Sequence, residues 1–178
     1  MNNLDCEGIK RMSVRLEKYS FRFSEEIFNS RLTLKNEIES IIYEACKDLS
    51  ILNRKVFNEK LCQLFTKHDW DSQIRVSPNM NAYSKFDFAK DRVAVEVQFG
   101  HASFIGIDLL KFQMASYSNL DLIDYGVYIT TTKKMQKHLT SSYKHNWEGS
   151  LNFEKVVKYL PHFKSAIQVP IYVIGIDI

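Results

Sequence analysis

The sequence predicts an α/β protein with a central mixed β-sheet flanked by helices, and three observations support this class. The chain has 178 residues, of which 45% are hydrophobic and 13% aromatic, so it can bury one sizeable core. Apolar residues recur at helical spacing in the first third and alternate at strand spacing further on. The segments follow the order helices, strand pair, helix, strand, helix and strand, which is typical of helices packed on a sheet.

The N-terminal third is predicted to be helical. Ser24 is a candidate helix cap, because the two glutamates that follow it would occupy the first turn. Apolar side chains recur at helical spacing over 27–49, with a break expected near 29–33. A second helical stripe covers 56–65 and is expected to begin after Asn53.

The period changes in the remainder of the chain. Residues 91–99 alternate and are rich in valine, so we expect a strand that pairs with a neighbouring strand over 86–90. The later elements are expected to be a helix over 103–117, a buried strand over 126–130, helices over 133–144 and 152–160, and a last strand over 169–178.

Composition argues against several classes of protein. No apolar run approaches the roughly 18 residues of a membrane span, and residues 1–11 lack the apolar core of a signal peptide, so we expect no membrane partner. The three cysteines match neither a disulfide framework nor a zinc site, and a cytoplasmic location is expected. We expect one domain over 1–178, with 1–11 as a flexible N-terminal extension. The net charge of +3 leaves a nucleic-acid partner open without indicating one.

Two acidic residues in the strand pair are candidates for a metal site. Alternation places the valines of 93–97 on one face of the strand, and Glu96 and Gln98 on the other. Asp87 lies nine positions before Glu96, a spacing that a hairpin can close. At about 4 Å the two carboxylates would repel by about 4 kcal/mol at an effective dielectric of 20, and a divalent cation would remove this conflict. Mg²⁺ prefers oxygen ligands, and the backbone carbonyl of Val97 could supply another.

The simpler alternative is an acid pair that faces solvent, because such pairs are common on edge strands. The spacing alone favours this alternative. The valine face opposite Glu96, and the amide of Gln98 two residues later, shift the balance toward a metal site, because buried polar groups need partners.

The stretch FDFAKDRVAVEVQFGHASFIGIDLL, residues 86–110, resembles the catalytic core of type II restriction endonucleases of the BglII/BstYI group, within the PD-(D/E)XK nuclease superfamily. Its motif DRVAVEVQFG has Gln where most of the superfamily has Lys, a variant that is specific to this small group. The similarity continues through 124–130, the pair at 148–149 and the closing VPIYVIGI.

This resemblance implies a restriction-endonuclease-like core and a homodimer that cuts both strands of a short palindromic site in double-stranded DNA. The reaction would use Mg²⁺ and a metal-activated water, and the site would contain GATC and give staggered ends. Asp87 and Glu96 would be metal ligands, and Gln98 would stand near the attacking water and the scissile phosphate. A polar residue beside that phosphate falls at Gln73 or Ser72.

Two segments are candidates for DNA contact. His101 matches a position where the group has a polar or basic base reader. The stretch 131–144 combines lysines, which would meet phosphates, with hydroxyl groups, which could reach base edges. Its candidates are Lys133, Lys134, Thr140, Ser141 and Ser142. From the residues alone, a solvated basic helix and a surface histidine are the simpler interpretations. The resemblance also makes Phe112 and Met114 candidates for the dimer contact.

Two other functions remain open. One is a less specific or structure-selective nuclease of the same superfamily, against which Gln98 argues. The other is a catalytically silent DNA-binding domain, against which the joint presence of Asp87, Glu96 and Gln98 argues.

Overall fold

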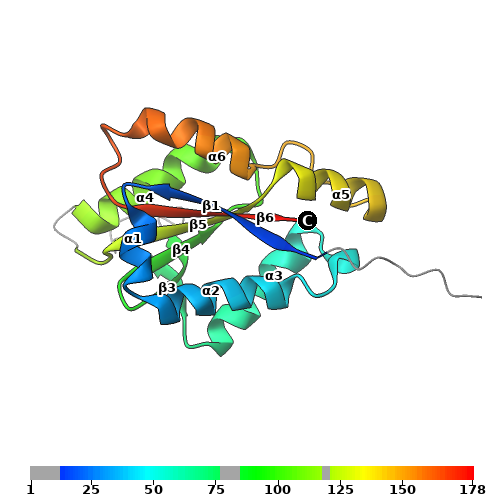
Figure 1. The fold of residues 1–178 in the computed structure, drawn as a ribbon, viewed down its shortest axis with the longest axis horizontal. Helices are drawn as coiled ribbons and strands as arrows, with labels where there is room; N and C mark the ends of the chain where they lie inside the picture. The colour runs from blue at the N-terminus through cyan, green and yellow to red at the C-terminus, as the bar shows by residue number, and fades with distance from the viewer. Residues whose placement is uncertain (1–12, 77–84, 118–120) are drawn as a thin grey trace, which may run out of the picture.

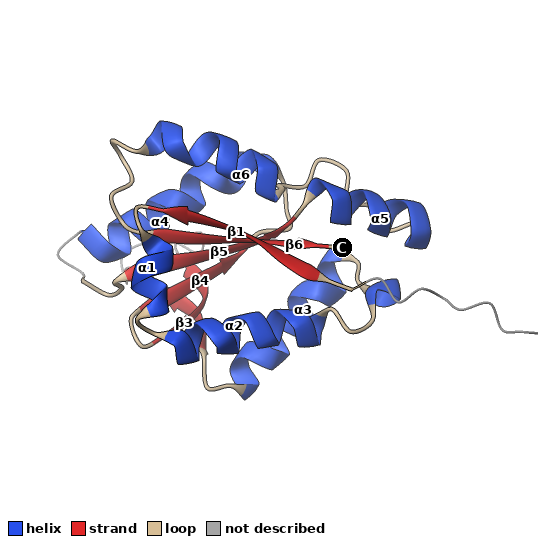
Figure 2. Ribbon diagram, viewed as in Figure 1, coloured by secondary structure: helices blue, strands red, loops and turns tan. Residues whose placement is uncertain are grey.

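The computed structural model describes residues 13–76, 85–117 and 121–178. The expected extension over 1–11 lies outside the described residues. The described part contains a mixed six-stranded sheet with helices on both faces, so the predicted fold class is confirmed (Figures 1 and 2). No helix within these ranges is long and apolar enough to cross a membrane.

The sheet has the strand order β1-β6-β5-β4-β3-β2. Strands β4, β5 and β6 run parallel to one another, while β1, β3 and β2 are added antiparallel at the two sides. The strands are β1 (Arg15–Phe21), β2 (Asp71–Arg75), β3 (Lys85–Lys90), β4 (Val93–Val97), β5 (Tyr125–Thr131) and β6 (Ile171–Asp177). All seven residues of β5 and of β6 are buried, which explains why both strands are nearly continuous apolar runs in the sequence.

Helices α2 and α3 cover one face of the sheet, and α4 and α6 cover the other (Figure 1). The helices are α1 (Ser24–Asn29), α2 (Leu32–Ala45), α3 (Arg54–Lys67), α4 (Ile105–Tyr117), α5 (Lys133–Tyr143) and α6 (Phe153–Tyr159). Short 3₁₀ turns lie at Leu49–Ile51, Ala102–Phe104 and Leu160–Phe163. Two hydrophobic cores result, one on each side of the sheet.

Helix α4 packs closely against the sheet, and this contact sets the position of its polar residues. The ring of Phe112 is fully buried, stacks on Phe86 at 5.1 Å between centroids, and lies directly over Gly126 of β5. A Cβ atom at Gly126 would come within 2.5 Å of that ring, so only glycine permits the approach. Phe112 is therefore a core residue, and its assignment to a dimer contact was wrong.

Local expectations were confirmed in part. The break near 29–33 separates α1 from α2, and Asn53 caps α3 by accepting hydrogen bonds from two backbone amides at 3.0 Å. Ser24 is not the cap, because it is the first residue of α1 and its hydroxyl donates to the carbonyl of Ile171. The edge strands β1 and β2 were missed, because both are rich in polar residues and lack the apolar runs of the central strands.

Candidate active site

The two acidic candidates are brought to one cavity by neighbouring strands. Asp87 lies on β3 and Glu96 on β4, which pair antiparallel through Phe88 and Val95. Both carboxylates line a cavity of about 260 Å³ between these strands and helix α4. Its lining residues are Gln73, Lys85, Asp87, Glu96, Gln98, Phe104, Ile107, Asp108 and Lys111.

The carboxylate of Asp87 is held by its neighbours. Its Oδ2 accepts the backbone N–H of Val97 at 2.8 Å, and its Oδ1 accepts the Gln73 amide at 3.4 Å. Burial raises the pKa of Asp87 above its ordinary value, although the hydrogen bond from Val97 partly offsets this shift. The ionised form of the Asp87 carboxyl group is thus disfavoured, and a bound cation would stabilise it.

Glu96 is the more deeply buried of the two acids, with 6% of its surface exposed. Its Oε1 accepts the ammonium of Lys111 at 2.6 Å. Its Oε2 is buried and has no hydrogen-bond partner among the described residues. Burial, and then repulsion by Asp87, raise the pKa of Glu96 well above its ordinary value.

These residues fit a hard cation with few protein ligands. An unpartnered, buried carboxylate oxygen beside a second carboxylate is a favourable ligand set for such an ion. Within the described ranges, no group of three or more His, Cys, Asp or Glu side chains could hold a metal. An ion here would therefore depend on two carboxylates together with backbone, water or substrate oxygens, as Mg²⁺ commonly does.

Gln98 lies just beyond the end of β4, and both ends of its amide are fixed. Its Nε2 donates to Asp108 Oδ2 at 2.9 Å, and its Oε1 accepts the backbone N–H of Gly100 at 2.7 Å. A Cβ atom at position 100 would lie 2.7 Å from Oε1, so a larger residue there would displace the Gln98 amide. Gln98 therefore enters the cavity in one defined orientation.

The structure separates the two upstream candidates. Gln73 reaches the cavity and contacts Asp87, whereas Ser72 pairs with Phe88 in the β2–β3 ladder and does not line the cavity. Gln73 has a φ of +56° within β2, a conformation that L-residues rarely adopt and that is found preferentially at functional sites. The ladder is interrupted at this residue and at Asp87 opposite it.

Val97 lines a second cavity next to the first. It contributes to an adjoining cavity of about 280 Å³ on the α3 side, which also includes Asn58, Glu59 and both Gln73 and Asp87. Asp87 and Gln73 thus form the partition between the two cavities.

The sequence did not reveal two buried, charged residues of the cavity. Asp108 and Lys111 project from α4, and both are buried. Asp108 Oδ2 also accepts the hydroxyl of Tyr128 at 2.8 Å, so it connects the helix, β5 and Gln98. The available signal was an acid and a lysine three residues apart within an otherwise apolar helix.

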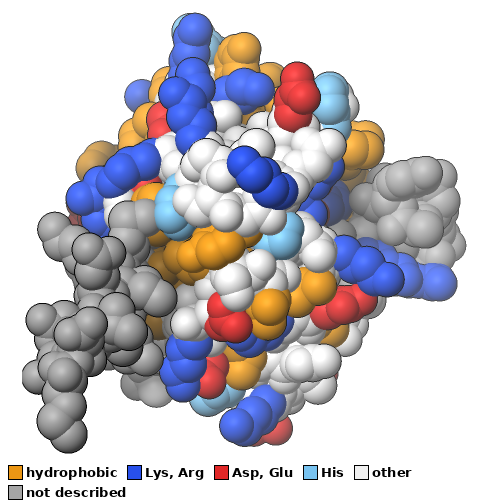
Figure 3. All heavy atoms as spheres, turned by 90° about the vertical axis from the view of Figure 1, so that its right-hand side faces the viewer, with side chains coloured by type: hydrophobic (Ala, Val, Ile, Leu, Met, Phe, Trp, Pro, Cys, Tyr) orange, Lys and Arg blue, Asp and Glu red, His pale blue; other side chains and the backbone are white. Residues whose placement is uncertain are grey.

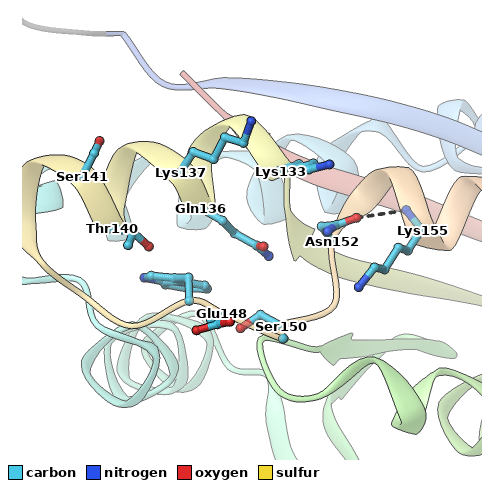
Figure 4. A pocket seen from close by; sticks show the side chains of 11 residues that line it. Lys133, Gln136, Lys137, Thr140, Ser141, Glu148, Ser150, Asn152 and Lys155 are labelled. Carbon is cyan, nitrogen blue, oxygen red and sulfur yellow. Dashed lines mark hydrogen bonds between the residues drawn. The ribbon is translucent and has the colours of Figure 1, made fainter.

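A second hollow, of about 650 Å³, lies between α5 and the segment 147–155 (Figure 4). Lys133, Thr140 and Ser141 line it, and Lys137 and Lys155 add two further cations. Figure 3 views the molecule from this end and shows more Lys and Arg than acidic side chains on the face.

The other DNA-contact candidates lie outside that lining. Lys134 donates to the carbonyl of Ile178 and lies 3.9 Å from Asp177, so it is drawn toward the end of β6. The Ser142 hydroxyl instead bonds to His138 at 3.2 Å. His101 forms a β-bridge with Ser150 at the edge of the hollow, and it is exposed.

Comparison with known proteins agrees with this architecture. The model of a family described as restriction endonuclease BglII/BglIII matches residues 16–176. The crystal structure of restriction endonuclease BglII complexed with a DNA 16-mer superimposes with a TM-score of 0.72 at 20% sequence identity. That superposition covers 90% of this chain and 75% of the other. No curated protein gives a significant sequence match.

Proposed function

Because the chain belongs to the BglII/BglIII restriction endonuclease family, and is therefore a type II site-specific endonuclease, we propose that it uses Mg²⁺ to cut both strands of a short palindromic site in duplex DNA. Enzymes of this kind are hydrolases that generally use divalent metal ions.

The observation that carries the proposal is the pair Asp87 and Glu96 in one cavity, with one buried Glu96 oxygen that has no partner among the described residues. Asp87 and Glu96 would hold the ion, and the backbone carbonyl of Val97, which follows Glu96 on β4, would supply a further oxygen. When bound, Mg²⁺ would lower the pKa of a coordinated water and stabilise negative charge on the phosphate.

The neighbouring side chains orient the reactants. Gln98 is presented in a fixed orientation by Asp108 and Gly100, so its amide can hold a polar atom at a set place beside the carboxylates. Gln73, strained and in contact with Asp87, is positioned to meet a phosphate oxygen through its amide. The nearby phosphodiester would thus be held by neutral amides, while the carboxylates hold the ion.

Double-stranded DNA is the proposed partner, since the structurally similar BglII was crystallised in complex with DNA. The hollow beside α5 offers lysines for phosphates and hydroxyls for base edges. Lys133 would meet the backbone, Thr140 and Ser141 would face the bases, and His101 stands at the edge of the same hollow. Lys134 and Ser142 have partners elsewhere in the chain and would have to leave them to contact DNA.

A homodimer fits a palindromic site, because a two-fold protein matches a two-fold sequence. The outer face of α4 supports this proposal. Apolar side chains that are 43–58% exposed follow one another along it and the preceding turn: Phe104, Ile107, Leu110 and Tyr117. A second copy that covers this stripe would place the two cavities on either side of the shared surface, because Phe104 and Ile107 also line the cavity.

The test is to map cut ends on genomic DNA after incubation with Mg²⁺. We expect discrete ends at one short palindromic sequence, and their loss in Glu96→Ala. Glu39→Ala is the matched control, since Glu39 is also a largely covered, lysine-paired glutamate but lies on α2. Smeared or structure-selective cutting would contradict site-specific cleavage by this chain. Tight DNA binding in Ca²⁺ without cutting in Mg²⁺ or Mn²⁺ would contradict catalysis.

A further inference from the structure

Lys111 lies inside the catalytic cavity although it comes from a helix rather than from the motif strand. Its ammonium is bonded to three acceptors: Glu96 Oε1 at 2.6 Å, Asp108 Oδ1 at 3.2 Å and the carbonyl of Lys85 at 3.1 Å. Its side chain is 9% exposed. Although burial lowers the pKa of Lys111, the two carboxylates raise it, so the group stays charged.

The motif strand itself brings no cation to this cavity. Gln98 occupies the position where most of the superfamily has Lys, and its amide is already engaged by Asp108 and Gly100. Three carboxylates line the cavity, those of Asp87, Glu96 and Asp108. Lys111 is the cation that contacts two of them.

Lys111 makes the two carboxylate oxygens of Glu96 unequal. It occupies Oε1, and Oε2 is left buried and unpartnered among the described residues. An ion bound at Oε1 would lie close to the positive charge of the Lys111 ammonium, so Oε2 is the favoured oxygen for an ion. With both oxygens free, the carboxylate could bind an ion through the pair, and the ion would sit differently relative to the phosphate.

We propose that Lys111 is a positioning residue of the endonuclease, which forces Glu96 to bind the catalytic cation through Oε2 alone. This inference rests on the proposed function and adds a residue that the sequence motif does not contain. Lys85 also lines the cavity, but Lys111 is the lysine whose ammonium contacts Glu96.

Packing of α4 does not require this lysine. The helix is anchored by Phe112, which lies over Gly126 and stacks on Phe86. Asp108 would keep the donors Gln98 and Tyr128 if Lys111 were absent. Removal would free both Glu96 Oε1 and Asp108 Oδ1, but Asp108 would still be held through Oδ2, so the larger effect falls on Glu96.

The test compares Lys111→Met with wild type in two measurements: single-turnover cleavage at saturating Mg²⁺, and Ca²⁺ binding by calorimetry. We expect cleavage to fall by about 100-fold, as for a small misplacement of a reacting group. Ca²⁺ affinity should be unchanged or higher, because both Glu96 oxygens become available. Lys111→Arg keeps a charged donor and should cut faster than Lys111→Met.

Lys35→Met is the matched control, because Lys35 is similarly covered and paired, with Glu25 and Asn29, but lies on α2 away from the cavity. It should cut like wild type. Lys111→Met that cuts at the wild-type rate, or that loses Ca²⁺ binding together with cleavage, would overturn the proposal. If Lys111→Met does not fold, Lys111→Gln replaces it, again with slower cleavage and unchanged or higher Ca²⁺ affinity expected. Failure of both to fold would assign Lys111 a purely structural role and also overturn the proposal. Absence of cleavage by wild type would instead contradict the proposed function.

Discussion

Asp87→Asn is expected to abolish cleavage and yet make the protein more stable when divalent ions are removed. The substitution keeps the size of the side chain, and an Asn oxygen can still accept the N–H of Val97. It removes a half-buried negative charge whose repulsion contributes to the raised pKa of Glu96. The variant loses a metal ligand, but it also loses the repulsion between Asp87 and Glu96, which destabilises the folded chain when no ion is bound.

The sign of the pH dependence follows from the direction in which the two pKa values move on folding. Burial raises the pKa of Asp87 above 3.8, and burial with repulsion by Asp87 raises that of Glu96 above 4.5. An acid with a raised folded-state pKa binds its proton more tightly in the folded than in the unfolded state. Stability is therefore lost as pH rises above the unfolded-state pKa and through the folded-state pKa. A tenfold difference in proton affinity between the two states corresponds to about 1.4 kcal/mol, which is roughly 3–6 °C in melting temperature for a chain of this length.

The assay is thermal unfolding at about pH 5 and about pH 8 in EDTA, repeated at the higher pH with Ca²⁺. In EDTA, wild type should lose more stability than Asp87→Asn between the two pH values and should melt lower at the higher one. Ca²⁺ at a hundredfold excess over Kd should raise the free energy of unfolding of wild type by about 2.7 kcal/mol, and its melting temperature should rise accordingly. The rise should be smaller for Asp87→Asn.

Asp71→Asn serves as the control, because Asp71 is an exposed aspartate on β2. It should follow wild type in every condition. If Asp87→Asn melts below wild type at the higher pH in EDTA, or if both show the same pH dependence, the two carboxylates do not destabilise one another. The structural basis for a cation at this site would then be lost.

Three other predictions test the dimer, the packing of α4 and base recognition. Leu110→Glu puts a charge on the exposed apolar stripe of α4 and should shift the protein toward monomer in sedimentation velocity; an unchanged dimer would exclude this stripe. Gly126→Ala should destabilise by about 1–3 kcal/mol in urea unfolding, since its Cβ would collide with Phe112. The control is Gly106→Ala on α4, where an added Cβ atom would meet no other atom within 4 Å. It should be neutral or stabilising by up to about 1 kcal/mol. Ser141→Ala should reduce discrimination against sites altered at one base pair by about 1–3 kcal/mol, and an unchanged ranking of sites would remove Ser141 as a reader.

The central part of the fold was predictable because its strands are buried on both faces. β5 and β6 are fully buried, so hydrophobicity alone identifies them. The edge strands β1 and β2 could not be identified in this way, because their residues are largely polar. β1 pairs with β6, which lies at the far end of the chain, and no local pattern carries that information.

The part of the candidate site that lies on strands was predictable from the alternation of side chains along a strand. Alternation along β4 places Glu96 and Gln98 on one face, and the β3–β4 hairpin brings Asp87 beside them. The strained backbone of Gln73 could not be predicted, because its φ of +56° follows from the interrupted pairing with β3. Local rules assign such a conformation to glycine or asparagine.

The part contributed by α4 shows why a motif read along one strand gives an incomplete account of a cavity. Considered by itself, the motif places no cation at its last polar position, since Gln98 is neutral and Arg92 is paired with Asp121 and Asp124. In the folded chain, Asp108 accepts hydrogen bonds from Gln98 and Tyr128 and lies 3.2 Å from the Lys111 ammonium, so strand amide and helix cation are joined through one carboxylate. The charge of the site is therefore a property of β4 and α4 together. The close approach of Phe112 to Gly126 sets the depth of that helix, and so the reach of Lys111 to Glu96.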